Sequence, residues 1–360
     1  MLPEYFAGQD EHFSRAFQVL ETGIAQKAFP GASVAITHRG KLVALKGIGR
    51  FTYDANSPVV TPETIYDLAS VTKVVATTAA CMLLYERGVF RLEQPVVEVL
   101  PEFSGHDPRR HRITFHQLLA HSSGLPGYVR LFERAHTRKD LIQEALRLPL
   151  AAAPGTRHEY SDIGFILLGV ALERLTKQSL DEFCHREIFS WLGLDHMAFL
   201  PPSEWKPVIP PTVEDRSFRR RIVQGEVHDE NAWVMDGVAG HAGCFATALD
   251  VAILADCLLY CKRQMGQSET VALFTRRESS PPGTSQALGW DTPSQPSQSG
   301  KYFSASSYGH LGYTGTSLWV DPERQLSVTL LTNRIWPDCS SQKIKQIRPA
   351  FHDAAVEALQ

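Results

Sequence analysis

Ser70 and Lys73 are the two residues of this sequence best placed to do chemistry together. No glycine or proline follows Ser70 until Gly88, so the sequence predicts one helix that begins near Ser70 and ends at Gly88. Side chains three positions apart share a helix face, and the residues after Lys73 are apolar on nearly every side, which predicts burial. Because burial lowers the pKa of a lysine, we expect a neutral Lys73 that can accept the Ser70 hydroxyl proton and make Ser70 a nucleophile.

The same spacing occurs twice more in the chain, at Ser203 and Lys206 and at Ser340 and Lys343. The first copy lies among prolines and is expected in a loop, and the second precedes a polar segment and is expected at an exposed helix start. Only the Ser70 copy leads an apolar helix. On this spacing alone, a serine that simply caps the helix is the alternative to a nucleophile.

Composition excludes several classes of function. The chain has 360 residues and a formal net charge of −3, which gives no reason to expect a nucleic-acid partner or an acidic membrane surface. Its start lacks the basic and apolar regions of a secretory signal, and no apolar run is long enough to span a membrane. The six cysteines show no disulfide spacing. These features predict a cytoplasmic protein, whereas the oligomeric state cannot be read from them.

Strand patterns lie near both ends of the chain. Residues 32–37 and 41–46 read as a hairpin around a tight turn, and residues 308–333 read as further strands. Helical patterns fill the middle. The expected fold class is α/β (α+β), with an antiparallel sheet flanked by the N- and C-terminal helices and a mostly helical second lobe.

The expected lobes follow from this order of elements. Residues 1–69 and 266–360 would form the lobe with the sheet, and residues 70–265 would form the helical lobe. A crevice between lobes is the usual place for a ligand, so we expect the active site there.

Two further segments join the Ser70 pair, and together they carry a resemblance. Tyr160-Ser161-Asp162 and His310-Leu311-Gly312 follow it in order. The three segments resemble the S-x-x-K, Y-x-N and K-T-G or H-x-G boxes of the penicillin-recognising serine hydrolases. The likeness extends over nearly the whole chain and is greatest to the class C β-lactamase branch, which includes DD-peptidases and β-lactamase-type carboxylesterases.

The resemblance implies the two-lobed fold and a set of roles. Ser70 would attack a carbonyl, Lys73 and Tyr160 would manage its proton, and the N–H groups of Ser70 and Tyr313 would form the oxyanion hole. Lys73 and His310 would be the two cations that lower the pKa of the Tyr160 phenol, although both cannot stay fully charged when buried together.

Two positions depart from the family pattern. Asp162 stands in place of the usual asparagine, so it could pair with Lys73 and keep it charged, or remove a hydrogen-bond donor for the substrate. His310 stands in place of lysine, which would make recognition of a substrate carboxylate weaker or dependent on pH. The segment Tyr313-Thr314-Gly315 is a rival register but lacks a cation at its first position. Either effect of Asp162 counts against an efficient β-lactamase.

The expected activity is that of a serine hydrolase without metal or other cofactor, acting through an acyl-enzyme. Four histidines recur every five residues, a spacing that does not suit a metal site, and His121 among them is expected to serve a turn. Substrates would be small-molecule carboxylic esters first, D-aminoacyl amides second and β-lactams third. The alternative is a catalytically slow sensor of β-lactams or muropeptides with the same fold. Candidate aromatic walls of the pocket are Tyr128, Trp233, Trp290 and Tyr313.

Overall fold

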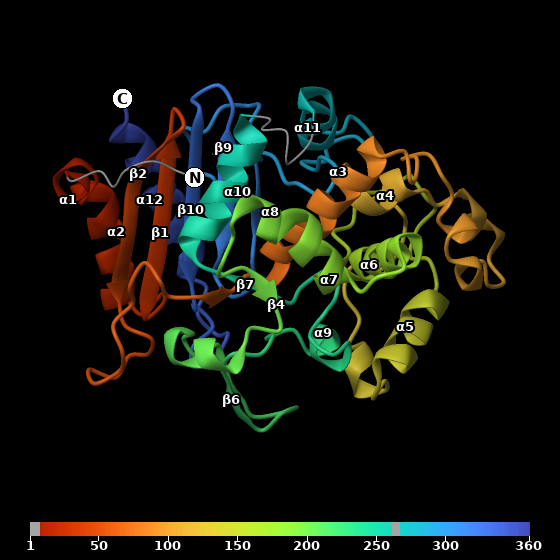
Figure 1. Cartoon of the computed structure of the whole chain (residues 1–360), viewed down its shortest axis with the longest axis horizontal. Helices are drawn as coiled ribbons and strands as arrows, with labels where there is room; N and C mark the ends of the chain where they lie inside the picture. Colours follow the sequence, from red (N-terminus) through yellow and green to blue (C-terminus); the bar gives the residue numbers. More distant parts are fainter. Residues whose placement is uncertain (1–7, 261–266) are drawn as a thin grey trace.

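The computed structural model describes residues 8–260 and 267–360 (Figure 1). Its main sheet is antiparallel and has the strand order β2-β1-β10-β9-β8. Ala32 lies opposite Thr332, so strands from the two ends of the chain are neighbours in one sheet, as predicted. The strands are β1 (Gly31–His38), β2 (Lys41–Gly49), β8 (Tyr308–Leu311), β9 (Ser317–Asp321) and β10 (Leu326–Thr332).

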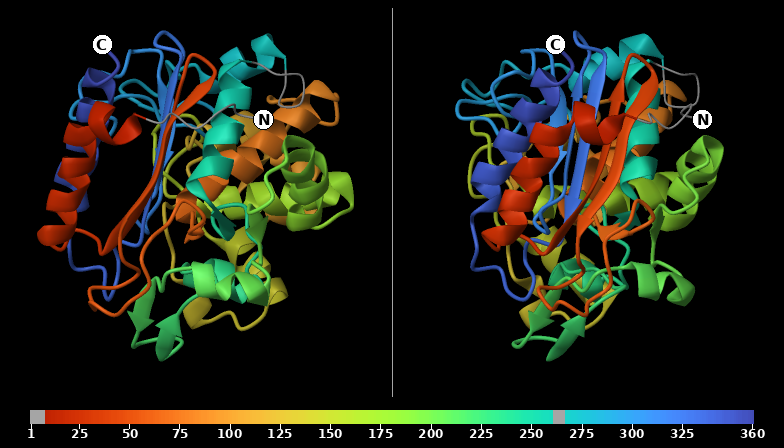
Figure 2. Two further views of the ribbon diagram at one scale, coloured as in Figure 1. Left: turned by 60° about the vertical axis from the view of Figure 1, so that its left-hand side comes forward. Right: turned by 90° about the vertical axis from the view of Figure 1, so that its left-hand side faces the viewer.

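Helices cover both faces of this sheet (Figure 2). On one face lie α2 (Ser14–Ala25) and α12 (Ile344–Glu357), which pack against each other. Val34 and Ile36 of β1 point into their hydrophobic core, whereas Ala35 belongs to the core on the opposite face. There α10 (Ala248–Leu259) packs on β1 and β10. Burial on both faces explains why β1 reads as a nearly continuous apolar run.

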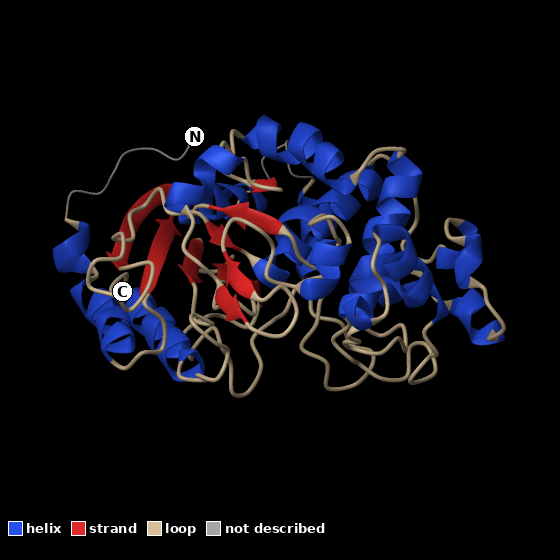
Figure 3. Ribbon diagram, turned by 90° about the horizontal axis from the view of Figure 1, so that it is seen from below, coloured by secondary structure: helices blue, strands red, loops and turns tan. Residues whose placement is uncertain are grey.

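The middle of the chain is mostly helical, as predicted, and lies beside the sheet in Figure 3. Two small sheets, β3-β7-β4 and β5-β6, join it. The remaining helices are α1 (Gln9–His12), α3 (Ala79–Glu86), α4 (Phe115–Leu119), α5 (Arg138–Arg147), α6 (Asp162–Thr176), α7 (Leu180–Cys184), α8 (Ser190–Leu192), α9 (Glu230–Val234) and α11 (Ser268–Thr275). The short strands are β3 (Tyr66–Asp67), β4 (Ala198–Phe199), β5 (Val213–Asp215), β6 (Arg221–Val223) and β7 (Cys244–Ala246).

The predicted division into lobes stays a proposal. Its boundary between residues 265 and 266 falls outside the described residues. Helix α10, assigned by sequence to the helical lobe, lies against the main sheet and connects the two parts. Within residues 8–260 and 267–360, no helix is both long and apolar enough to cross a membrane.

Candidate active site

The segment that carries Ser70 is helical and buried, but it is not one α-helix. It begins with a 3₁₀ turn at Ala69–Val71, continues as a π-helix over Lys73–Thr78, and becomes α3 only at Ala79. Helix α3 ends at Glu86, close to the predicted end. The wider π turn is a local feature often found at functional sites, and it follows the proposed nucleophile directly.

Lys73 is completely buried and makes three polar contacts. Its Nζ lies 2.9 Å from Ser70 Oγ, 2.7 Å from Asp162 Oδ1 and 3.0 Å from the carbonyl oxygen of His241. The first contact is the pairing that the three-residue spacing predicted. The second joins residues that lie far apart in the sequence, because Asp162 opens helix α6.

The charge of Lys73 differs from the sequence-based expectation. Burial alone would lower its pKa, but the Asp162 carboxylate and the Tyr160 phenol more than offset burial, so the pKa of Lys73 is raised. Lys73 is therefore an ammonium that donates to Ser70 Oγ, and the expectation of a neutral lysine is wrong. Of the two effects foreseen for Asp162, pairing with Lys73 is the one the structure contains.

Tyr160 lies over the same ammonium, with its ring centroid 4.9 Å from Lys73 Nζ. Its hydroxyl is close enough to Lys73 and Ser70 for both groups to favour the ionised phenol and lower its pKa. His121 positions this tyrosine, since its ring packs against that of Tyr160 at 4.6 Å and its Nδ1 accepts the Ser161 N–H at 2.9 Å. Burial raises the pKa of Tyr160 although Lys73 opposes this effect, so the phenol is protonated at neutral pH.

His310 lies near Tyr160 but does not act as a second cation. The two ring centroids are 5.9 Å apart, and His310 is buried. Burial and the neighbouring Lys73 ammonium lower the pKa of His310 to about 3. Its Nδ1 donates to the Leu311 carbonyl at 2.8 Å, as a neutral imidazole can. The expectation that Lys73 and His310 would both be cations is therefore wrong for His310.

The turn after β8 is fastened to the nucleophile segment. Thr314 Oγ1 donates to the Asp67 carbonyl at 2.8 Å, and Thr316 Oγ1 donates to the Leu68 carbonyl at 2.9 Å. A Cβ on Gly312 would lie 2.0 Å from Thr316 Oγ1 and 2.5 Å from the Leu68 carbonyl, so only glycine permits this approach. The arrangement brings Tyr313, the residue after Gly312, to the side of Ser70.

The glycine-rich run 237–243 also approaches other backbone closely. A Cβ on Gly240 would lie 2.2 Å from the Phe165 carbonyl. Thr77 of the π-helix donates to the Gly240 carbonyl at 2.7 Å. These contacts fix the next residue, His241, whose carbonyl accepts a hydrogen bond from Lys73.

A cavity of about 900 Å³ opens in front of these groups. Its wall includes six of the seven predicted site residues, namely Ser70, Tyr160, Asp162, His310, Gly312 and Tyr313. Lys73 does not line the cavity but contacts Ser70 and Asp162, which do.

Two of the four aromatic candidates line this cavity. They are Tyr128 and Tyr313. Trp290 instead lies fully buried in the core, and Trp233 donates to Glu226.

Two arginines in the cavity wall were not found from the sequence. Arg334 donates through Nε to the Tyr313 carbonyl at 2.8 Å, and Arg348 donates to Gln298 Oε1 at 3.2 Å. Burial and the nearby Arg334 charge lower the pKa of Arg348 to about 9, and its Nε has no partner. Among the described residues, neither guanidinium pairs with a carboxylate. Arg334 directly follows the last predicted strand, which is a weak signal, and nothing in the sequence singled out Arg348.

Taken together, these contacts suit acyl transfer. A serine hydroxyl lies beside an ammonium and a phenol at the edge of a cavity. A hydroxyl in this setting can attack a carbonyl once a neighbouring group takes its proton. No three His, Cys, Asp or Glu side chains of the described chain come together in a way that could hold a metal ion.

Comparison with known proteins identifies a family and several relatives of this chain. The profile of the Beta-lactamase family matches residues 16–338. An N-acetylmuramyl-L-alanine amidase of Bacillus subtilis (strain 168) is 33% identical over 354 residues, covering 88% of this chain and 80% of that protein. A protein of Escherichia coli (strain K12) that carries the provisional name D-alanyl-D-alanine carboxypeptidase is 31% identical over 343 residues, covering 85% and 79%.

Solved structures share the fold at lower sequence identity. EstCE1, a hydrolase with promiscuous acyltransferase activity, superposes with a TM-score of 0.77 at 22% identity, covering 95% of this chain and 99% of that one. A class C beta lactamase from Rhodobacter sphaeroides gives a TM-score of 0.75 at 21% identity, covering 96% and 100%.

Proposed function

Because the chain belongs to the Beta-lactamase family, whose members include serine hydrolases, we propose that it hydrolyses small carboxylic esters or amides through an acyl-enzyme on Ser70. The observation that carries this proposal is the contact of Ser70 Oγ with Lys73 Nζ at 2.9 Å and with the Tyr160 hydroxyl. A serine that only capped a helix would not need a buried ammonium and a phenol beside it.

In the proposed reaction, Tyr160 is the base and Lys73 stabilises its ionised form. Lys73 is already protonated by its pairing with Asp162, so it has no free lone pair for the Ser70 proton. When Tyr160 has lost its proton, the phenolate accepts the proton of Ser70 while Oγ bonds to the substrate carbonyl carbon. The leaving group departs with the proton from Tyr160, and water then cleaves the acyl-enzyme by the same route in reverse.

The carbonyl oxygen of the substrate becomes negative during attack. We assign its stabilisation to the backbone N–H groups of Ser70 and Tyr313. The hydrogen bonds of Thr314 and Thr316 to the Asp67 and Leu68 carbonyls support this assignment, because they hold the two segments together.

The two unpaired arginines favour substrates that carry a carboxylate. Arg334 and Arg348 lie in the wall of the same cavity as Ser70, and their mutual repulsion is not relieved by a carboxylate of the described chain. Two buried guanidinium groups would bind a carboxylate strongly. The sequence alone ranked small carboxylic esters first, whereas these cations favour D-aminoacyl or related amides with a free carboxylate above them. The names of the B. subtilis and E. coli relatives support the same order.

The test compares two esters of equal acyl length. Mono-p-nitrophenyl glutarate carries a carboxylate, and p-nitrophenyl valerate does not; nitrocefin and a D-Ala-D-Ala peptide complete the panel. We expect turnover of the glutarate with the higher kcat/KM, loss of turnover in Ser70→Ala, and a mass increase of one acyl group on wild-type Ser70. Arg348→Met should reduce the preference for glutarate but leave valerate turnover intact. Undiminished hydrolysis by Ser70→Ala would overturn the proposal.

The alternative function is a slow sensor of β-lactams or muropeptides with the same fold. It predicts a single burst of p-nitrophenol and a long-lived acyl-enzyme instead of steady turnover. Lys73 and Tyr160 are both present and in contact with Ser70, which favours the enzyme over the sensor.

A further inference from the structure

Asp67 is a buried carboxylate close to Ser70 that the proposed mechanism does not use. Among the residues that the structure describes, no cation pairs with its side chain, which instead accepts two backbone N–H groups. Oδ1 accepts the Ala69 N–H at 2.8 Å, and Oδ2 accepts the His228 N–H at 2.6 Å. Ala69 precedes Ser70 and has a positive φ of 46°, a conformation that a non-glycine residue adopts only when its surroundings impose it. The carboxylate therefore holds a strained turn against a distant segment.

That distant segment leads back to the catalytic lysine. Asp229 follows His228, and its Oδ1 lies 2.8 Å from His241 Nε2. The His241 carbonyl accepts from Lys73 Nζ, which in turn donates to Ser70 Oγ.

The contacts thus close into a ring, which we call the contact ring. It runs from Asp67 through His228 and Asp229 to His241, Lys73 and Ser70, and returns along the backbone to Asp67. Because the peptide 228–229 is one rigid unit, Asp67 sets the position of the Ser70 turn relative to the group that holds Lys73.

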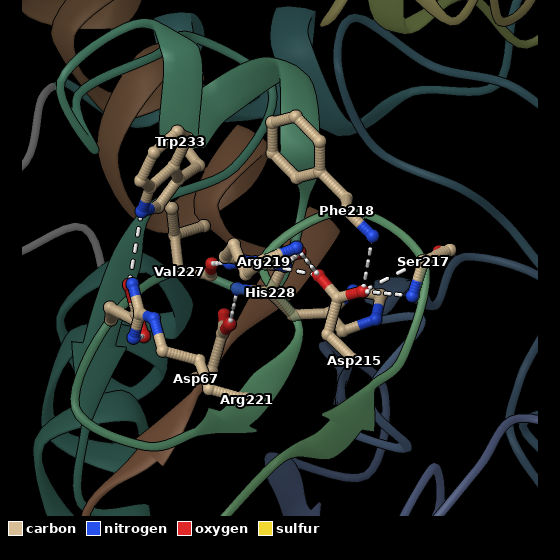
Figure 4. Close-up of polar contacts among 10 residues, drawn as sticks. Asp67, Asp215, Ser217, Phe218, Arg219, Arg221, Val227, His228 and Trp233 are labelled. Atoms are coloured by element: carbon tan, nitrogen blue, oxygen red, sulfur yellow. Dashed lines mark hydrogen bonds and ion pairs between the residues drawn. The ribbon is translucent and has the colours of Figure 1, made fainter. Parts of the chain in front are cut away.

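Residues 215–228 hold the peptide 228–229 in place, and Figure 4 shows the contacts. Arg219 is buried and pairs with Asp215 at 2.9 Å. The same guanidinium donates to the Val227 carbonyl at 2.6 Å and to the His228 carbonyl at 2.5 Å. Figure 4 shows the side chain of Asp67 reaching the N–H of His228 in the irregular segment after β6. His228 is therefore held through both its carbonyl and its N–H.

The ring of His228 extends the effect to the proposed oxyanion hole. It stacks on Tyr313 with centroids 5.5 Å apart and planes inclined by 26°. Tyr313 is also covered by Arg334 at 4.5 Å. A shift of His228 would therefore move both the partner of Asp67 and the neighbour of Tyr313.

We propose that Asp67 is a positioning residue of this active site, which sets the Ser70 turn against the Lys73 and Tyr313 side through its bond to His228. The proposal rests on the function proposed above. A displacement of about 1 Å at a reacting group can lower a rate by about a hundredfold. Loss of one Asp67 bond should therefore act on kcat, because the residue does not line the cavity and does not contact the substrate.

The test uses Asp67→Asn, which keeps size but replaces one acceptor by a donor, so one of the two N–H groups loses its partner. We expect kcat for p-nitrophenyl glutarate to fall by about tenfold to a hundredfold with KM changed less than about threefold. The matched control is Asp250→Asn. Asp250 is also buried, accepts a distant N–H from His196 at 3.2 Å and lies outside the contact ring, so its kcat should stay at the wild-type value.

A pH profile separates positioning from simple loss of stability. Burial raises the pKa of Asp67 to about 6, against the effect of its two N–H donors. Of the groups that face it, the Arg219 guanidinium lowers the pKa of Asp67 and the Asp229 carboxylate raises it, whereas His228 and Cys244 stay neutral between about pH 5 and 8. Wild-type kcat should therefore fall more steeply below about pH 6 than above it, because protonation of Asp67 removes an acceptor in addition to the protonation of Tyr160, and Asp67→Asn should keep only the uniform fall that Tyr160 causes.

The outcomes are distinct. An unchanged kcat in Asp67→Asn, an equal fall in Asp250→Asn, or the same steepening below about pH 6 in Asp67→Asn would each overturn the positioning role while wild-type Ser70 still forms its acyl adduct. If wild type forms no Ser70 adduct with either ester, the proposed function fails, and the positioning role fails with it.

Discussion

Replacing Asp162 by asparagine removes the charge that keeps Lys73 protonated, and the consequences can be worked out from the structure. Lys73 is 0% exposed and Asp162 17% exposed at the side chain, with 2.7 Å between Nζ and Oδ1. Without the carboxylate, burial dominates and the pKa of Lys73 falls below that in the wild type. A neutral Lys73 can then accept the Ser70 proton directly.

The size of the stability loss follows from burial. Removing one partner of a buried ion pair costs about 3–5 kcal/mol. The lower end applies here, because the asparagine carbonyl and the His241 carbonyl remain as acceptors, so we expect about 3 kcal/mol. At roughly 2 °C per kcal/mol for a chain of this size, the melting temperature should fall by about 6 °C.

The sign of the pH dependence is fixed by the raised pKa of Lys73. A lysine whose folded pKa exceeds its unfolded value of about 10.4 contributes its full stabilisation below that pH and loses it as pH rises through the folded pKa. The difference between wild type and Asp162→Asn should therefore be complete at pH 7 and shrink only at strongly alkaline pH.

Two assays check this prediction. Urea unfolding at pH 7 gives the free energy of unfolding, and the rise of kcat/KM with pH should level off at lower pH in Asp162→Asn than in wild type. The control is Glu102→Gln, which removes an exposed ion pair with Arg174 and should cost less than about 1 kcal/mol. Equal losses in the two variants, with unshifted pH profiles, would refute the argument that Lys73 is a buried ammonium held by Asp162.

Three further outcomes follow from the same geometry. Tyr160→Phe should lower kcat by about a hundredfold to ten-thousandfold, and wild-type kcat/KM should rise with pH without a plateau below about pH 10, because the pKa of Tyr160 is raised; a flat alkaline profile would count against a tyrosine base. Gly312→Ala should destabilise by about 1–3 kcal/mol in urea unfolding and reduce turnover, since the new Cβ meets Thr316 Oγ1 and the Leu68 carbonyl; wild-type stability would contradict the close approach. Iodoacetamide should slow turnover by alkylating Cys339, which is exposed and lines the cavity, and Cys339→Ser should be resistant; equal inactivation of both would locate the effect elsewhere.

Much of the fold was predictable because its elements carry strong patterns. The hairpin 32–46 and the strands after residue 308 alternate or run apolar between clear turns, and their position at both chain ends implied one sheet. The helix after Ser70 was predicted from an unbroken apolar stretch. Its π turn was not, because the local apolar pattern does not distinguish a π turn from an α-helix.

The identity of the site residues was more predictable than their charges. Ser70, Lys73 and Tyr160 stand in recognisable boxes, and the structure brings them into contact. The protonation of Lys73 depends instead on a 2.7 Å distance to Asp162, and that of His310 on its burial beside Lys73. No local pattern reports such distances.

Sequence reasoning missed residues that act through backbone groups and an arginine whose setting depends on the fold. Asp67 and His228 meet through a main-chain N–H, and His241 serves Lys73 through its carbonyl. Because nearly every residue type can supply a main-chain N–H or carbonyl, the residue type at that position does not signal such a contact. Arg348 is an ordinary helical residue until the fold places it beside Arg334.

The pairing of β1 with β10 determines when the enzyme can first become active during its synthesis. Strand β1 leaves the ribosome early, but its neighbour in the sheet ends only at Thr332. The threonines that fasten the Ser70 turn, Thr314 and Thr316, also arrive in this last stretch. The helical middle, which holds Lys73, Asp162 and His241, can collapse beforehand, yet the turn that carries Ser70 is not fastened to the sheet until translation is nearly complete, so a prematurely terminated chain should carry Ser70 and remain inert.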